Sequence, residues 1–164
     1  LGISDKRGWP SFEVLQPMYN LVKRQVETEI LPLALSEGLA VMPYSPLGGG
    51  LLTGKYAGGA RPEGARHVAS AAYTRRYEND WMHEVAGDFT SFCGERGLHP
   101  VSTAVAWAGG HPGVTCPIIG ARNVDQLKPS LAAAEIDMTP ELWAEIAALS
   151  RPPAIATDRS EEAG

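Results

Sequence analysis

The stretch that most constrains the fold of this chain is Leu39–Lys55, LAVMPYSPLGGGLLTGK, where a short apolar run meets two prolines and three consecutive glycines. The apolar residues 39–42 predict a buried strand, and Pro43 and Pro46 end it because proline donates no hydrogen bond to a ladder. The glycines at 48–50 carry no Cβ, so the backbone there can turn sharply and lie against a ligand. Inward-pointing amides of such a loop can bind an anion.

Three interpretations of this loop compete. A flexible surface turn is the commonest use of a glycine run. A phosphate-binding loop of the nucleotide triphosphatases matches the G-x-x-x-x-G-K spacing of Gly49–Lys55. That motif continues with Ser or Thr, where this chain has Tyr56, and with a helix, where this chain has several helix breakers, so we treat the match as coincidence. The third interpretation is a family resemblance that extends well beyond the loop.

Composition limits the classes of protein to consider. A chain of 164 residues can form one domain with a core, and 44% apolar and 20% charged residues are ordinary for a globular protein. A net charge of −5 argues against a nucleic-acid partner. No apolar run is long enough for a membrane span, and Leu1 opens no signal segment. Cys93 and Cys116 form no C-x-x-C pair and have no metal-ligand spacing to histidine, so we expect no metal and a cytoplasmic protein.

The strand with YSPLGGGLLTGKY resembles the seventh strand and following loop of the aldo-keto reductases. Three further strings are similar to neighbouring strands of that family. Residues 1–5, LGISD, resemble the end of its fifth strand. A predicted strand at 12–16, which runs into the string VLQPMYNL, resembles its sixth. The predicted strand Val114–Ile119 and the following GARNVDQLKPSL resemble its eighth strand and its adenosine-phosphate site.

The resemblance implies an α/β fold, a partial (β/α)8 TIM barrel made of strands five or six to eight and the C-terminal helix. A whole barrel typically needs about 250 residues. We expect the C-terminal half barrel over residues 1–150 and a fraying tail over 151–164. Lys23–Glu37 has apolar residues at helical spacing, with a proline at 32 that should disturb the helix, and predicts a right-handed β-α-β unit with its flanking strands. Later periodic segments predict helices at 78–96, 100–107 and 139–148.

The connection between the first two predicted strands is too short. Parallel strands need a crossover of about a dozen or more residues, usually a helix. Only Asp5–Ser11 separates Ser4 from Phe12, and this stretch contains a glycine and a proline. Either residues 1–5 are not a barrel strand, or a helix of the parent protein is missing from this chain. We favour the second, because KRGWP resembles the loop that follows that helix in related reductases.

The resemblance also implies an NADP(H) site shared by three loops. Ser4, Asp5 and Gln16 would bind the nicotinamide carboxamide, and Tyr44 would stack on the nicotinamide ring. The glycine loop would line the pyrophosphate, and the segment after the eighth strand would bind the adenosine end. The complete predicted set of cofactor-binding residues is Ser4, Asp5, Gln16, Tyr44, Ser45, Pro46, Leu47, Gly48, Gly50, Lys55, Gly120, Arg122, Gln126 and Ser130.

The adenosine end has a physical basis of its own. A helix that starts at Asn123 or Asp125 offers free amides and a dipole that favour a phosphate. Arg122 adds a forked, charged donor for a 2′-phosphate, which favours NADP over NAD. Pro129 and Ser130 stand where the family commonly has an acidic residue and Asn. The Ser130 hydroxyl can replace part of the Asn's hydrogen bonding, whereas Pro129 cannot replace the acidic side chain.

Plainer interpretations stay open for some of these residues. Gln16 taken alone is a polar residue at the end of a strand. Lys55 is explained equally well by solvation and by approach to the adenosine phosphate. For Arg61 solvation is the better explanation. Arg61 lies within 56–75, a long segment without periodicity that in the family can fold over the cofactor.

The family's catalytic Asp, Tyr, Lys and His lie in the first half of the barrel, and no string here matches their surroundings. We therefore expect no catalytic residue, and an isolated chain that binds NADP(H) without turnover. The parent reaction would reduce a small aldehyde or ketone to an alcohol, with hydride from NADPH and a proton from a tyrosine. Open sheet edges predict association with the missing half or with another copy. The alternatives are a non-catalytic NADP(H)-binding module resembling channel-associated subunits of this fold, and a fragment that binds nothing.

Overall fold

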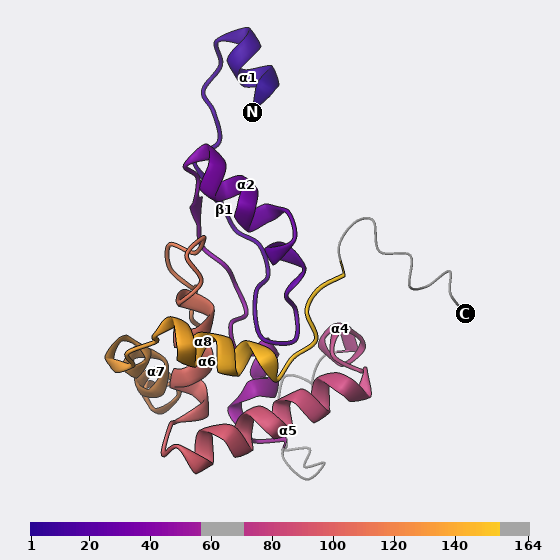
Figure 1. The fold of residues 1–164 in the computed structure, drawn as a ribbon, viewed down its shortest axis with the longest axis vertical. Coiled ribbons are helices and arrows are strands. Elements are labelled where there is room, and N and C mark those ends of the chain that lie inside the picture. The colour runs from indigo at the N-terminus through magenta and orange to yellow at the C-terminus, as the bar shows by residue number, and fades with distance from the viewer. Residues whose placement is uncertain (57–70, 155–164) are drawn as a thin grey trace, which may run out of the picture.

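The computed structural model describes residues 1–56 and 71–154. These residues form an α/β structure in which a small parallel sheet lies beside packed helices (Figure 1). Within these ranges, none of the helices combines the length and apolar character that crossing a bilayer requires. The predicted tail beyond residue 154 and the interpretation of Arg61 lie outside the described residues. In order, the elements are α1 (Gly2–Arg7), β1 (Val14–Leu15), the 3-10 helix η1 (Gln25–Glu27), α2 (Ile30–Glu37), β2 (Ala40–Val41), the 3-10 helix η2 (Gly48–Thr53), α4 (Ala71–Arg76), α5 (Asp80–Glu95), α6 (Pro100–Gly109), α7 (Val124–Leu131), the 3-10 helix η4 (Ala132–Glu135) and α8 (Pro140–Ala148).

The sheet is parallel, as the β-α-β prediction requires. Val14 pairs with Ala40 in β1 and β2. The pairing continues past both strands, since the Tyr44 N–H donates to Pro17 O at 2.9 Å. On the other side of the same segment, Tyr44 forms a parallel bridge with Ile118. Three extended segments therefore run in one direction, and residues 40–44 lie in the middle.

The segment Val114–Ile119 pairs with this middle strand but does not form the regular strand that its sequence predicts. Its pairing is irregular because the Val41 N–H donates to the Thr115 side-chain hydroxyl, at 3.0 Å, instead of to a ladder carbonyl. The Val41 carbonyl accepts from two successive amides, Thr115 N at 2.8 Å and Cys116 N at 3.3 Å. Prolines at 43 and 117 also remove one donor from each segment.

The helix predicted over Lys23–Glu37 starts at Ile30 instead. Lys23 closes a tight turn, because its N–H donates to Asn20 O at 2.9 Å, and η1 follows this turn. The late start places Pro32 in the first turn of α2, where backbone N–H groups have no partner inside the helix. The helix ends as predicted at Gly38, which adopts φ 67°.

The prediction that residues 1–5 form a barrel strand is wrong for this chain. They belong to α1, which Gly8 ends in the left-handed conformation with φ 62°. None of the residues in α1 is buried, and the helix projects away from the rest of the fold (Figure 1). A helix bonds its own backbone groups, whereas a strand here would need a neighbour to complete its ladder.

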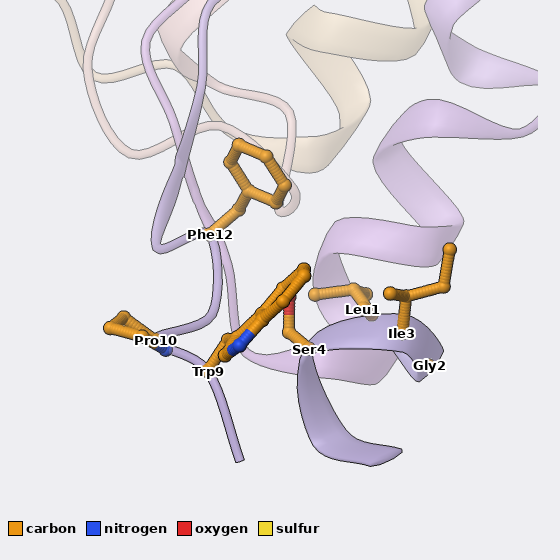
Figure 2. Close-up of a pocket in the computed structure, with 7 residues that line it drawn as sticks. All are labelled: Leu1, Gly2, Ile3, Ser4, Trp9, Pro10 and Phe12. Atoms are coloured by element: carbon orange, nitrogen blue, oxygen red, sulfur yellow. The ribbon is translucent and has the colours of Figure 1, made fainter. Parts of the chain in front are cut away.

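A hollow of about 680 Å³ lies between α1 and the segment that follows it (Figure 2). The backbone N–H of Trp9 donates to the backbone carbonyl of Ser4 at 2.8 Å, so the residue that carries the indole lies beside the helix. Phe12, 69% exposed, lies at the rim. This end of the molecule therefore presents apolar side chains that the described residues do not cover. The lining residues are Leu1, Gly2, Ile3, Ser4, Trp9, Pro10 and Phe12.

The helical predictions in the second half of the chain are confirmed. Helix α5 buries Val85, Phe89 and Cys93 on the predicted face, and α6 begins with Pro100 at its first position. At α8, the hydroxyl of the N-cap Thr139 accepts a bond from Leu142 N at 3.2 Å. Helix α5 packs on η2, and α6 packs on α7 and η4. The core side chains come mainly from residues 19–22, α2, η2, α5, α6 and α8.

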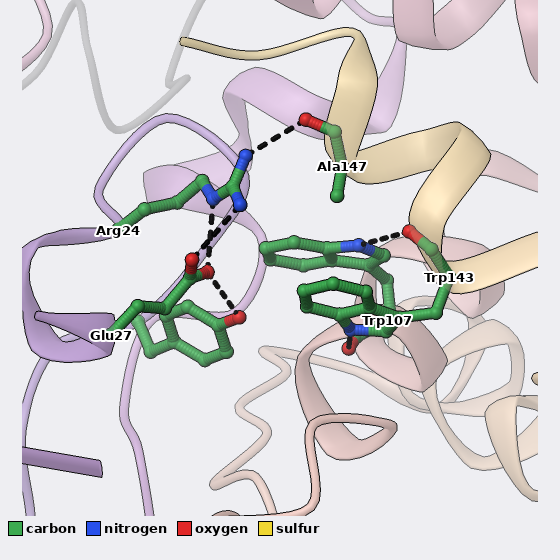
Figure 3. A network of polar contacts seen from close by, with 6 residues as sticks. Arg24, Glu27, Trp107, Trp143 and Ala147 are labelled. Carbon is green, nitrogen blue, oxygen red and sulfur yellow. Dashed lines mark hydrogen bonds and ion pairs between the residues drawn. The ribbon is translucent and has the colours of Figure 1, made fainter. Parts of the chain in front are cut away.

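Two tryptophans join α6 to α8. The Trp107 Nε1–H donates to the carbonyl of Trp143 at 3.2 Å, and the Trp143 Nε1–H donates to the carbonyl of Trp107 at 3.0 Å (Figure 3). Their rings stack at a centroid distance of 5.4 Å and an angle of 7°. Each indole thus satisfies its only donor inside the core.

A partly buried ion pair lies beside this stack (Figure 3). The Arg24 guanidinium donates to both carboxylate oxygens of Glu27, each at 2.9 Å. It also donates to the Ala147 carbonyl, at 2.8 Å, in the last turn of α8, where a positive charge is favoured. Glu27 in addition accepts a 2.6 Å bond from the Tyr19 hydroxyl. This network ties the chain after β1 to the C-terminal helix.

Candidate cofactor site

The carboxyl ends of the three extended segments lie together at one end of the sheet. Because β1, the 40–44 segment and the 114–118 segment are parallel, their carboxyl ends lie at the same end of the sheet, and the loops that follow them start there. The first segment pairs as far as Met18, two residues beyond Gln16, the second as far as Tyr44 and the third as far as Ile118. In open α/β sheets, ligands bind at the carboxyl ends of the strands. The two loops with the strongest sequence motifs therefore begin at the end where a ligand is expected.

The glycine loop has the sharp turn that its sequence predicts. Tyr44, 36% exposed, stands at its start. Ser45 adopts φ 59° and is the one non-glycine residue of the described chain with positive φ. Gly48–Gly50 follow with φ 57°, 65° and 99°. Leu51 and Leu52 are fully buried and anchor the far end of the loop. The loop therefore turns without side chains at residues 48–50, and Gly48 and Gly50 are themselves buried.

Lys55 returns to the glycine loop. A Cβ added at Gly50 would lie 2.7 Å from Lys55 Nζ, so the ammonium group packs against the Gly50 α-carbon. Lys55 Nζ also lies 5.1 Å from the centre of the Tyr56 ring. The structure thus places the lysine charge beside the backbone of the proposed pyrophosphate loop.

The second loop precedes α7. Asn123, one of the two predicted helix starts, is the N-cap, and its Oδ1 accepts from Gln126 N at 3.0 Å. The Gln126 Oε1 in turn accepts from the Arg122 backbone N–H at 3.2 Å. Residues 120–126 are all exposed. Arg122 and Gln126 therefore lie together on an accessible helix start, with part of the hydrogen-bonding capacity of Gln126 used in capping.

Ser130 is not brought to this exposed loop. Only 3% of its surface is accessible, and within the part of the chain that the structure describes its hydroxyl has no hydrogen-bond partner. The neighbouring Pro129 lies inside α7 and its carbonyl accepts from the Ser102 hydroxyl of α6 at 2.6 Å. The two departures from the family pattern thus occur where α7 packs on α6.

Ser4 and Asp5 are also separated from the other predicted residues. Both belong to α1, which stands apart from β1 and β2 in Figure 1. The prediction that they contact the same nicotinamide as Gln16 is not met by this arrangement. It depended on residues 1–5 forming a strand, and in the structure residues 2–5 lie in α1 instead.

Burial removes two other groups from acid–base chemistry near neutral pH. It raises the pKa of the Cys93 thiol to about 11. Burial, with the bond to Glu27, also raises the pKa of the Tyr19 hydroxyl far above its ordinary value. Neither group is suited to give up a proton to a substrate.

Two polar residues with no role predicted from the sequence, Asn20 and Tyr77, lie beside the glycine loop. Both are fully buried, and their side chains bond to each other. The available signal was Asn20 itself, a polar side chain within the apolar string Tyr19–Val22. Buried polar groups require partners, so such a residue indicates a specific structural contact.

Comparison with known proteins identifies the class to which this fold and site belong. The sequence model of the Aldo/keto reductase family matches residues 3–151, and the chain is a member of that family. It is 32% identical to Protein tas of Escherichia coli over 149 residues, which cover 91% of this chain and 43% of that protein. It is 34% identical to the uncharacterized oxidoreductase YrpG of Bacillus subtilis, over 85% of this chain and 40% of that protein.

A third relative carries a different kind of name. A probable voltage-gated potassium channel subunit beta of Arabidopsis thaliana is 34% identical over 127 residues, which cover 75% of this chain and 38% of that protein. The chain therefore spans less than half the length of each of these relatives.

Proposed function

We propose that this chain is the NADP(H)-binding, C-terminal half of a (β/α)8 oxidoreductase that reduces aldehydes or ketones to alcohols. The observation that supports it is the common origin of the glycine loop and the Arg122 loop at one end of the parallel segments. One loop has bare backbone and a lysine, and the other has an accessible arginine at a helix start. A dinucleotide with a pyrophosphate in its middle and a 2′-phosphate at one end matches these two loops.

Each residue has a defined role in this proposal. Tyr44 presents its ring to the nicotinamide face, and Gln16 donates to and accepts from the carboxamide. The glycine loop and Lys55 bind the pyrophosphate, and Arg122 binds the 2′-phosphate. When bound, the cofactor supplies the hydride for carbonyl reduction. The proton donor would come from the other half of the barrel, so these residues orient the cofactor without completing the reaction.

The open edge of β1 supports a missing half. Leu15, Pro17 and Tyr19 bond or pair toward the middle segment, so the backbone groups of Val14 and Gln16 point to the opposite edge. Val14 is 49% exposed there. We propose that a strand of the missing half, or a second copy, covers this edge in a cytoplasmic protein. Light scattering on the isolated chain should show association, and a stable monomer would contradict this part.

The function is tested by titrating the chain with NADPH, followed by nicotinamide fluorescence, beside an aldehyde-reduction assay. We expect saturable binding, weaker binding of NADH and no turnover. Absence of NADPH binding to the folded chain contradicts the proposal. Turnover by the chain alone contradicts the assignment of the catalytic residues to the missing half.

A second candidate is a non-catalytic NADP(H)-binding module, which the similarity to a potassium channel subunit favours. The two candidates agree on cofactor binding and differ in the other half of the barrel. The test adds the N-terminal half of the barrel as a second polypeptide. The mixture should reduce aldehydes if that half carries the family's catalytic Asp, Tyr, Lys and His. Complex formation with NADPH binding but no reduction would favour the module.

A further inference from the structure

Asn20 connects two strand-end loops through a fully buried side chain. Its Nδ2 donates to the carbonyl of Ser45 at 3.0 Å, and its Oδ1 accepts from Val22 N at 3.1 Å. The same Nδ2 also donates to the Tyr77 hydroxyl at 3.3 Å. The amide of Asn20 thus uses both of its ends, and it fixes the glycine loop to the chain that follows β1.

Ser45 is a residue that needs such support. Its φ of 59° lies in the left-handed region, which costs a non-glycine residue about 1–3 kcal/mol. Its carbonyl accepts from Gly48 N at 3.0 Å as well as from Asn20. Two donors therefore orient this one carbonyl, and the orientation sets the direction in which the chain leaves Tyr44 and enters the glycines.

Tyr77 supports the same loop from the other side. A Cβ added at Gly48 would lie 3.6 Å from Cε1 of Tyr77, so the ring packs against the start of the glycine run. The Tyr77 hydroxyl accepts from Asn20 and donates to Met18 Sδ at 3.6 Å. The Tyr77 carbonyl lies 2.9 Å from Nε2 of His83, and this contact joins Tyr77 to α5.

We infer that Asn20 and Tyr77 are positioning residues that hold Ser45 and Gly48 in the conformation that binds the nicotinamide and pyrophosphate part of the cofactor. The inference rests on the proposed function and adds to it. Neither side chain reaches the surface, so both act through the loop and not by touching the ligand. The capping bonds of the Arg122 loop are formed within residues 122–126.

This arrangement predicts a split between the two ends of the cofactor. NADPH occupies both loops, whereas adenosine 2′,5′-bisphosphate carries only the adenosine end. Asn20→Asp keeps the shape of the side chain and removes the donor to Ser45 O. Tyr77→Phe keeps the ring and removes the hydroxyl. Loss of one hydrogen bond that positions the loop should weaken NADPH binding about two- to tenfold, and binding of adenosine 2′,5′-bisphosphate by less than about twofold.

Tyr19→Phe is the matched control, since it removes a buried tyrosine hydroxyl that bonds to Glu27 and not to the loop. It should leave the ratio of the two affinities unchanged. Circular dichroism establishes which variants are folded, and Tyr77→Phe carries the test if Asn20→Asp does not fold. An unchanged affinity ratio in folded Tyr77→Phe overturns the inference, as does an equal loss for both ligands. Wild-type chain that binds neither ligand overturns the proposed function and this inference with it.

Discussion

The two loops assigned to opposite ends of the cofactor are held in different ways. The glycine loop is fixed by buried side chains that are distant in sequence, since Asn20 lies 25 residues from Ser45 and 57 from Tyr77. The loop before α7 is exposed and bonds to itself, across three residues from Asn123 to Gln126 and across four from Arg122 to Gln126. The first conformation therefore depends on the tertiary fold, and the second depends on local capping.

Because the two loops are held differently, substitutions in them should have different effects on the free energy of unfolding and on ligand affinity. Changes around the glycine loop should alter the free energy of unfolding together with ligand affinity. Changes in the second loop should alter affinity, and should cost stability only where they remove its local cap. The following substitutions test that difference, in order of decreasing expected effect.

Glu27→Ala should have the largest effect on stability. It removes the carboxylate partner of the partly buried Arg24 and the acceptor of Tyr19, which directly precedes Asn20. Breaking a buried ion pair costs about 3–5 kcal/mol, so for this partly buried pair we expect a loss of about 3 kcal/mol in urea unfolding. Glu145→Ala is the control, because its pair with Arg96 is exposed and should contribute about 0–1 kcal/mol. Similar losses for the two variants would contradict the role of burial.

Gly50→Ala should affect both stability and binding. The residue has φ 99°, and the new Cβ would displace the Lys55 ammonium group, 2.7 Å away. We expect a loss of about 1–3 kcal/mol in unfolding free energy, with weaker NADPH binding. Gly120→Ala is the matched control in the second loop, where a Cβ meets no atom within 4 Å. A wild-type unfolding curve for Gly50→Ala would show that the loop is not held in this conformation.

Arg122→Ala should reduce affinity for NADPH more than affinity for NADH. Removal of an exposed guanidinium that binds the 2′-phosphate should weaken NADPH binding about tenfold, or about 1.4 kcal/mol, and NADH binding much less. Arg122→Lys retains the charge without the forked geometry of the guanidinium, and its affinity for NADPH should lie between those of the wild type and Arg122→Ala. Isothermal titration calorimetry measures the affinities. Equal losses for NADPH and NADH would argue against the 2′-phosphate assignment.

Asn123→Ala should lower stability by about 1 kcal/mol through loss of the N-cap, whereas Asn123→Gly should cost only a few tenths. Thermal unfolding measures both variants. A loss several times larger would mean that this loop depends on tertiary contacts in the same way as the glycine loop.

The smallest expected effect concerns pH. Burial lowers the pKa of His111, and its Nδ1 accepts a bond from Gly113 N at 3.0 Å, which requires that nitrogen to be unprotonated. The unfolded chain, with its ordinary pKa of 6.5, then binds the proton more readily than the folded chain. Stability is full above that pH and falls as the pH drops toward the lower folded pKa. His111→Gln should flatten this dependence in thermal unfolding between about pH 7.5 and 5.

The same contrast explains how much of the molecule could be predicted from its sequence. The N-caps Asn123 and Thr139 and the stop at Gly38 depend on a few adjacent residues, and all three were predictable. The glycine run likewise indicated its sharp turn. These features are local, so neighbouring residues determine them.

The features that the sequence did not reveal depend on distant partners. Residues 1–5 resemble the end of a barrel strand, but a strand also needs pairing with a distant segment, and here residues 2–5 form α1 instead. Thr115 interrupts the ladder through a side chain whose contact with Val41 spans 74 residues. The pairing of Asn20 with Ser45 and Tyr77 has the same origin. Periodicity and motif spacing contain no information on such contacts.

The stacked indoles of Trp107 and Trp143 give the molecule an internal optical probe. Two parallel chromophores 5.4 Å apart interact electronically, so their near-ultraviolet dichroism reports directly on whether α6 and α8 remain docked. Trp9 lies at the far, exposed end of the molecule and emits from a wet environment. The separation of α6 from α8 can therefore be followed without a label, and independently of conformational changes around α1.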